Sequence, residues 1–171
     1  METAPRTNEL GNTVVLGVGN LLMCDEGVGV HTVTAFERDY TFPSSVRCVD
    51  GGTSTQELLG DLEDLDHLIV IDAVSANLPP AGLLRLEGAA VPAAFTTKLS
   101  PHQIGISDLL ATLTFMGRAP KHVVLLGCEP KTLHLDLELS PEVKARVPEL
   151  CEQVAGELRK LGLASKKRAL A

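Results

Sequence analysis

The 171-residue sequence has a net charge of −7, with 44% hydrophobic but only 3% aromatic residues. This length fits a single domain that can bury an aliphatic core without a disulfide or structural metal. The acidic balance, without a basic face, argues against a nucleic-acid partner, and no apolar run is long enough to span a bilayer. Four cysteines without C-x-x-C spacing argue against structural zinc and favour free thiols in a reducing cytoplasm.

Short aliphatic runs alternate with helical patterns along the chain. In chain order they predict a strand at 13–18, a helix from 25 to 40, a strand at 45–49, a helix at 55–62, strands at 67–72 and 83–86, an irregular connection at 88–99, a helix at 100–117, a strand at 122–127 and a helix at 140–162. The strand at 67–72 has the clearest pattern, because four consecutive aliphatic residues precede Asp72.

Capping residues mark the ends of the predicted helices. Asp25, Ser100 and Ser140 are expected to be N-caps, and the two serines are each followed by proline, which suits the first helical position. Glycines after two of the helices suit C-caps. Pro148 is expected to kink the last helix.

The alternation of strands and helices predicts an α/β fold. We expect a three-layer α/β/α sandwich with a largely parallel, twisted sheet of about five strands, since its strands are continuous apolar runs. Residues 1–171 are expected to form a single domain with loose tails at 1–11 and 164–171, and to act as a monomer. The basic cluster at 166–168 is interpreted as part of a solvated tail.

A glycine-rich turn follows the first strand. Gly17 and Gly19 lie between a strand and a helix, where a dinucleotide fingerprint would be found, but Leu22 occupies the position of its third glycine. The Gly-Lys-Ser/Thr of a P-loop is absent as well. The turn is better explained as backbone that bends tightly at a strand end.

Two carboxylates are candidates for function at the carboxyl edge of the sheet. Glu26 lies at the start of the first helix, beside Asp25, for which we favour a purely structural capping role. Asp72 ends the strand at 67–72, where a side chain either enters the ligand crevice or caps the next segment.

His102 completes a possible metal-binding set. It lies in the first turn of the helix at 100–117, where the helix dipole disfavours the imidazolium form. Neutral imidazole and two carboxylates suit a divalent transition metal, although His102 could equally be a surface residue. Cys24 could be a soft ligand or a nucleophile, but free cysteines usually pack as small apolar groups.

Four segments together resemble the hydrogenase maturation endopeptidases. In chain order they are VVLGVGNLLMCDEGVGVHTV, VDGGTS, DHLIVIDAV and FTTKLSPHQIGISDLL. The likeness extends from about residue 14 to residue 161. The first and last segments are specific in combination, whereas a glycine-rich turn alone would not be.

The resemblance implies a peptidase that removes a short C-terminal extension from the precursor of the nickel–iron hydrogenase large subunit, after nickel insertion. Glu26, Asp72 and His102 match the family's metal-contacting residues. Residues 50–53, which are Asp50, Gly51, Gly52 and Thr53, match a segment linked to cleavage control or substrate recognition. The nickel would be presented by the substrate rather than held as a permanent cofactor. That Asp72 acts as base on the attacking water is a further hypothesis.

Two other functions stay open from the residues. A non-catalytic chaperone that checks nickel loading would use the same three side chains. A nucleotide or nucleoside enzyme could be built on a similar sheet, although Leu22 and the missing P-loop lysine argue against it.

Overall fold

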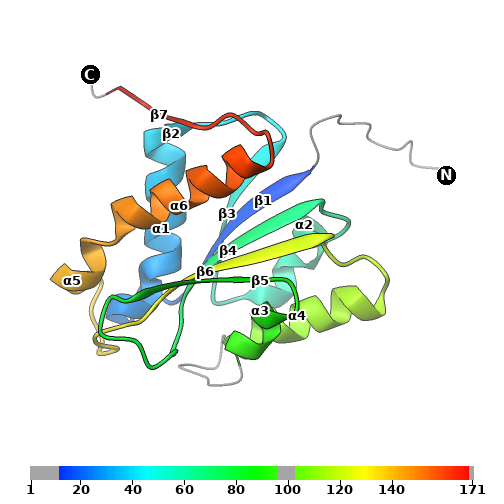
Figure 1. The fold of residues 1–171 in the computed structure, drawn as a ribbon. Coiled ribbons are helices and arrows are strands. Elements are labelled where there is room, and N and C mark those ends of the chain that lie inside the picture. Colours follow the sequence, from blue (N-terminus) through cyan, green and yellow to red (C-terminus); the bar gives the residue numbers. More distant parts are fainter. Residues whose placement is uncertain (1–11, 96–102, 170–171) are drawn as a thin grey trace.

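A five-stranded sheet lies at the centre of the computed structural model, which describes residues 12–95 and 103–169 (Figure 1). Its strands are β1 (Thr13–Val18), β3 (Val46–Gly52), β4 (His67–Ala73), β5 (Leu83–Glu87) and β6 (His122–Cys128). They lie in the order β3-β1-β4-β6-β5, and every neighbouring pair is parallel except β5 with β6. The predicted α/β fold with a largely parallel sheet is confirmed.

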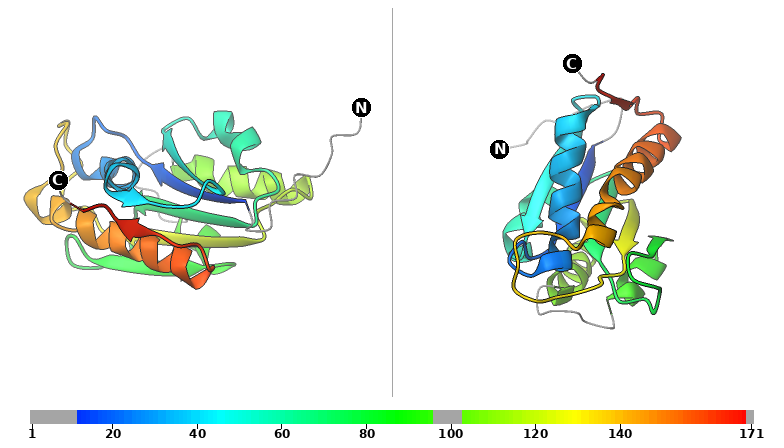
Figure 2. Two further views of the ribbon diagram at one scale, coloured as in Figure 1. Left: turned by 90° about the horizontal axis from the view of Figure 1, so that it is seen from above. Right: turned by 90° about the vertical axis from the view of Figure 1, so that its left-hand side faces the viewer.

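Helices cover both faces of the sheet (Figure 2). One face carries α1 (Val28–Asp39) and α6 (Val147–Lys160), while the other carries α2 (Leu59–Leu62), α3 (Ala90–Ala94) and α4 (Gln103–Phe115). Three shorter elements are η1 (Cys24–Gly27), η2 (Thr55–Leu58) and α5 (Pro141–Lys144). In the described part of the chain, no helix is both long and apolar enough to cross a membrane.

Each parallel strand contributes to two cores because its side chains alternate between the faces. In β4, Ile69 and Ile71 belong to the core beneath α1 and α6, whereas Leu68 and Val70 belong to the core beneath α2 and α4. All four are almost fully buried. Burial on both faces explains why the strand appears in the sequence as an unbroken apolar run.

Three expectations about the helices are wrong. The helix predicted from Asp25 starts as the 3₁₀ turn η1, and α1 begins only at Val28. The connection predicted to be irregular contains α3. Pro148 does not kink a continuous helix: it lies in the first turn of α6, where the missing proline N–H costs no hydrogen bond, and the preceding turn is the separate helix α5.

Within the tail that was expected at 164–171, the described residues 166–168 are not loose. Lys166–Lys167 form β7, which pairs with β2 (Tyr40–Thr41) in antiparallel orientation. The Arg168 N–H also donates to the Asp39 carbonyl at 2.7 Å. This basic segment is therefore exposed but held against the end of α1.

Close packing of α1 against the sheet requires glycine at its second residue. A Cβ built on Gly29 would lie 2.1 Å from the Ile71 carbonyl oxygen and 2.3 Å from that of Val18. We expect Gly29→Ala to lower the free energy of unfolding by about 1–3 kcal/mol, because α1 must shift away from β1 and β4.

Urea unfolding would measure this loss, and Gly156→Ala in α6 is a matched control. A Cβ on Gly156 meets nothing closer than an Arg159 nitrogen at 3.9 Å. The control is expected to stabilise the protein by about 0.5–1 kcal/mol, since alanine suits a helix interior better than glycine. Equal stability of the two variants would contradict the packing argument.

Candidate functional site

The order of the strands reverses at β1, which has β3 on one side and β4 on the other. In open α/β sheets, ligands bind outside the carboxyl ends of the strands at such a switch point. The segments that follow β1, β3 and β4 all emerge at this edge. Glu26 lies in the segment after β1, whereas residues 50–53 and Asp72 lie at the carboxyl ends of β3 and β4, so the structure brings these predicted site residues to one region.

Glu26 lies in η1, the turn that connects β1 to α1, and only 2% of it is exposed. This turn contacts β4. The close approach of Gly29 to the Ile71 carbonyl presses the start of α1 against the end of the same strand. Residue Glu26 is thereby held near the carboxyl end of β4.

Asp72 is the penultimate residue of β4 and is fully buried. One of its oxygens, Oδ1, accepts the N–H of Ala73 at 2.8 Å. Glu26 and Asp72 therefore reach the same edge from two different strands. Carboxylates are costly to bury, and such groups in a crevice are candidates for binding or catalysis.

Residues 50–53 form the rim of this edge. Gly52 pairs with Val18, and its carbonyl accepts the Gly19 N–H at 3.0 Å. The exposed Asp50 carboxylate accepts the Gly52 N–H at 2.9 Å, and Gly52 has a positive φ of 46°. The turn is fixed beside η1, and its residues Asp50 and Thr53 are exposed to solvent. Its position is compatible with substrate recognition, which stays a prediction.

His102 lies outside the described residues, together with the expected N-cap Ser100. Within residues 12–95 and 103–169, no group of three or more His, Cys, Asp or Glu residues is arranged to hold a metal ion.

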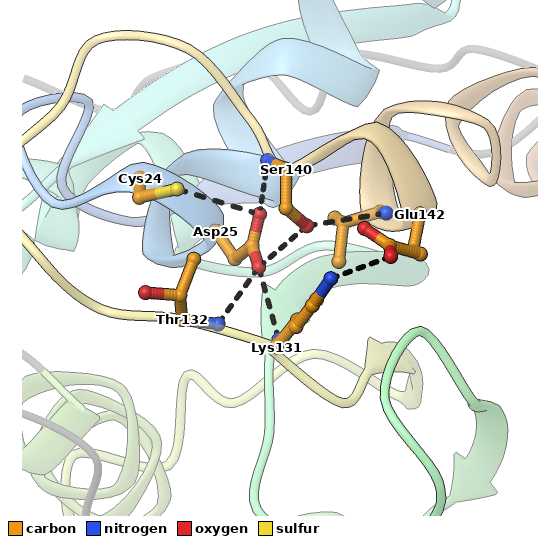
Figure 3. A network of polar contacts seen from close by, with 7 residues as sticks. Cys24, Asp25, Lys131, Thr132, Ser140 and Glu142 are labelled. Atoms are coloured by element: carbon orange, nitrogen blue, oxygen red, sulfur yellow. Dashed lines mark hydrogen bonds and ion pairs between the residues drawn. The ribbon is translucent and has the colours of Figure 1, made fainter.

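Asp25 holds the turn that carries Glu26, and the sequence did not reveal this role (Figure 3). Its fully buried carboxylate accepts the backbone N–H groups of Lys131, Thr132 and Ser140 at 2.7–3.0 Å and the Ser140 hydroxyl at 2.9 Å. No side-chain cap of α1 is formed. Asp25 is structural, as expected, but it anchors a distant loop instead of capping its own helix.

Cys24 does not have the setting of a nucleophile. The residue is buried, and its thiol donates to Asp25 Oδ1 at 3.8 Å. Burial and the negative charge of Asp25 raise the pKa of the thiol, which disfavours the reactive thiolate. Packing beside Asp25 is the better explanation for this residue.

An apolar pocket of about 270 Å³ opens just beyond Asp72, between the segment after β4, strand β5 and helix α3. Its lining residues are almost all small or aliphatic: Val74, Ser75, Ala76, Leu78, Leu84, Leu86, Ala93 and Ala94. A pocket of this character just beyond the buried Asp72 suits a substrate with apolar side chains near its reacting group.

The chain is similar to proteins of one known family over most of its length. Residues 30–157 match the family model of the HycI hydrogenase maturation proteases. The chain is 45% identical over 151 residues to the hydrogenase 2 maturation protease of Escherichia coli, covering 88% of this chain and 92% of that protein. It is 37% identical to the hydrogenase expression/formation protein HupD of Bradyrhizobium diazoefficiens, and the match covers 96% of this chain and 87% of that protein.

Solved structures show the same fold. The hydrogenase maturating endopeptidase HybD from E. coli superimposes with a TM-score of 0.88 at 44% identity, covering 92% of this chain and 98% of that one. HybD from Thermococcus kodakarensis gives a TM-score of 0.70 at 26% identity, and the match covers 86% of this chain and 98% of that one. With likeness across nearly the whole of these relatives, the chain belongs to the hydrogenase maturation protease family and is a peptidase of hydrogenase maturation.

Proposed function

We propose that this peptidase removes the C-terminal extension of the nickel–iron hydrogenase large-subunit precursor after nickel has been inserted. The nickel is part of the substrate, and Glu26, Asp72 and His102 contact it during recognition. The observation that carries the proposal is the pair of buried carboxylates that two separate strands bring to one edge of the sheet.

Electrostatics explains how nickel loading can control cleavage. The negative charge of carboxylate groups attracts a divalent cation, which is the largest local charge where it binds. Carboxylate and imidazole groups are suitable ligands for nickel. A precursor without nickel offers no cation to Glu26 and Asp72, so it lacks the interaction that positions its peptide for cleavage.

The proposal is tested with nickel-loaded and nickel-free precursor. The purified protein is incubated with each form, and release of the C-terminal peptide is followed by intact-mass spectrometry. We expect cleavage of the loaded form and no measurable cleavage of the nickel-free form. Equal cleavage of both forms would refute recognition through nickel, whereas a bound but intact loaded precursor would identify a nickel-sensing chaperone.

A further inference from the structure

Exposed leucines gather on the two segments that enclose η1. Among the described residues, four of the seven exposed large apolar side chains belong to this group, which we name the leucine patch. It consists of Leu21, Leu22, Leu135 and Leu137, which are 39%, 56%, 79% and 64% exposed. The first two follow β1, and the other two lie in the loop after β6, more than a hundred residues further along the chain.

Backbone pairing joins the two halves of the leucine patch. Met23 and Asp136 form an isolated parallel bridge, in which the Asp136 N–H donates to the Leu22 carbonyl at 3.1 Å and the Cys24 N–H donates to the Asp136 carbonyl at 2.9 Å. Leu22 is adjacent to one bridge residue, and Leu135 and Leu137 flank the other. In Figure 2 the loop after β6 passes around η1, which agrees with this pairing.

The leucine patch continues directly into the proposed site. A Cβ built on Gly27 would lie 3.2 Å from Leu21 Cδ2, so Leu21 packs against the residue that follows Glu26. The loop that carries Leu135 and Leu137 also supplies the N–H groups that hold Asp25, the residue before Glu26 (Figure 3). A protein that presents a peptide to Glu26 and Asp72 would therefore also contact these neighbouring leucines.

The charged groups of the loop are already paired within the chain. Lys131 is paired with Glu142, and Glu138 with Lys144. They leave the exposed leucines as the main feature that a partner can use. Rigid anchoring by the Met23–Asp136 bridge also lowers the entropic cost of binding, because little backbone has to be ordered.

We infer that the leucine patch docks an apolar surface of the folded precursor protein beside its C-terminal extension. This inference rests on the proposed function. Four leucines offer a patch on the order of a few hundred Å², a size typical of functional surface sites. Stable complexes bury about 800 Å² on each partner, so the patch favours a substrate that binds and leaves over a permanent second copy of this chain.

The test compares Leu135→Ser/Leu137→Ser with the control Phe115→Ser. All three side chains are exposed, so neither variant opens a core cavity. Phe115 is 94% exposed and ends α4, from which the chain leads to the amino end of β6, at the edge opposite the site. With nickel-loaded precursor, we expect the double variant to raise KM about tenfold or more, as loss of an interface anchor does, with kcat unchanged. The control is expected to match wild type.

Direct binding of the two variants to immobilised precursor separates this inference from the proposed function. If wild type binds the precursor without cleaving it, the proposed function fails. Even then, weaker binding by the double variant but not by Phe115→Ser still supports the leucine patch as a docking site. Unchanged binding and KM in the double variant, or an equal loss in Phe115→Ser, would overturn the inference. So would a wild-type dimer that the double variant converts to monomer, because a second copy would then occupy the leucines.

Discussion

Replacing Asp72 with asparagine is expected to lower kcat for cleavage of the nickel-loaded precursor by about 100- to 10,000-fold, the range typical for loss of a general base. Asparagine keeps the shape and can still accept the Ala73 N–H through its carbonyl oxygen. It cannot take a proton from water at neutral pH. The measurement is the initial rate of C-terminal peptide release at saturating precursor.

Kinetic analysis of this variant distinguishes two roles of Asp72. A residue that only contacts nickel would raise KM and leave most of kcat at saturation. A base would lower kcat and remove the acidic limb of its pH profile. Asp61→Asn is a suitable control, because Asp61 is a half-exposed carboxylate paired with Arg47 on the surface. Unchanged cleavage by Asp72→Asn would eliminate Asp72 from the chemistry.

Replacing Asp25 with alanine is expected to lower the free energy of unfolding by about 3–5 kcal/mol. The substitution leaves the N–H groups of Lys131, Thr132 and Ser140 and the Ser140 hydroxyl without their buried acceptor. Each such donor costs about 1–3 kcal/mol when it stays buried, and water that enters the space recovers part of that sum. Urea unfolding followed by circular dichroism gives the loss directly.

Ser140→Ala provides the matched comparison, since it removes one donor to Asp25 and the cap of α5 but keeps the carboxylate. A loss of about 1 kcal/mol is expected for it. Because Asp25 precedes Glu26, the Asp25 variant is also expected to lose cleavage activity under conditions where it is fully folded. Wild-type stability in Asp25→Ala would show that the network in Figure 3 contributes little.

Strands β1 and β4 were predictable because each is buried on both faces. Such a strand is an apolar run in the sequence, and the predicted runs at 13–18 and 67–72 coincide almost fully with β1 and β4. The helix boundaries were less predictable. Pro148 is compatible with either a kink or a first turn, and only the packing of α6 on the sheet selects the second.

The candidate site was likewise predictable only in part. Asp72 could be selected as a candidate because it ends an apolar run, and Glu26 because it follows a glycine-rich turn after another such run. The partners of Asp25 lie more than a hundred residues away, so no local pattern could reveal them. For the same reason, the pairing of Met23 with Asp136 and the leucine patch that it creates were not visible in the sequence.

The alternation of strands and helices could be predicted from the sequence alone, because it depends on local hydrophobic periodicity. Only the tertiary structure decided which strand ends are neighbours. The order β3-β1-β4-β6-β5 places the switch point at β1 and brings Glu26, Asp50 and Asp72 to one edge. Strand order depends on contacts between residues far apart in the chain, which a local sequence pattern cannot predict.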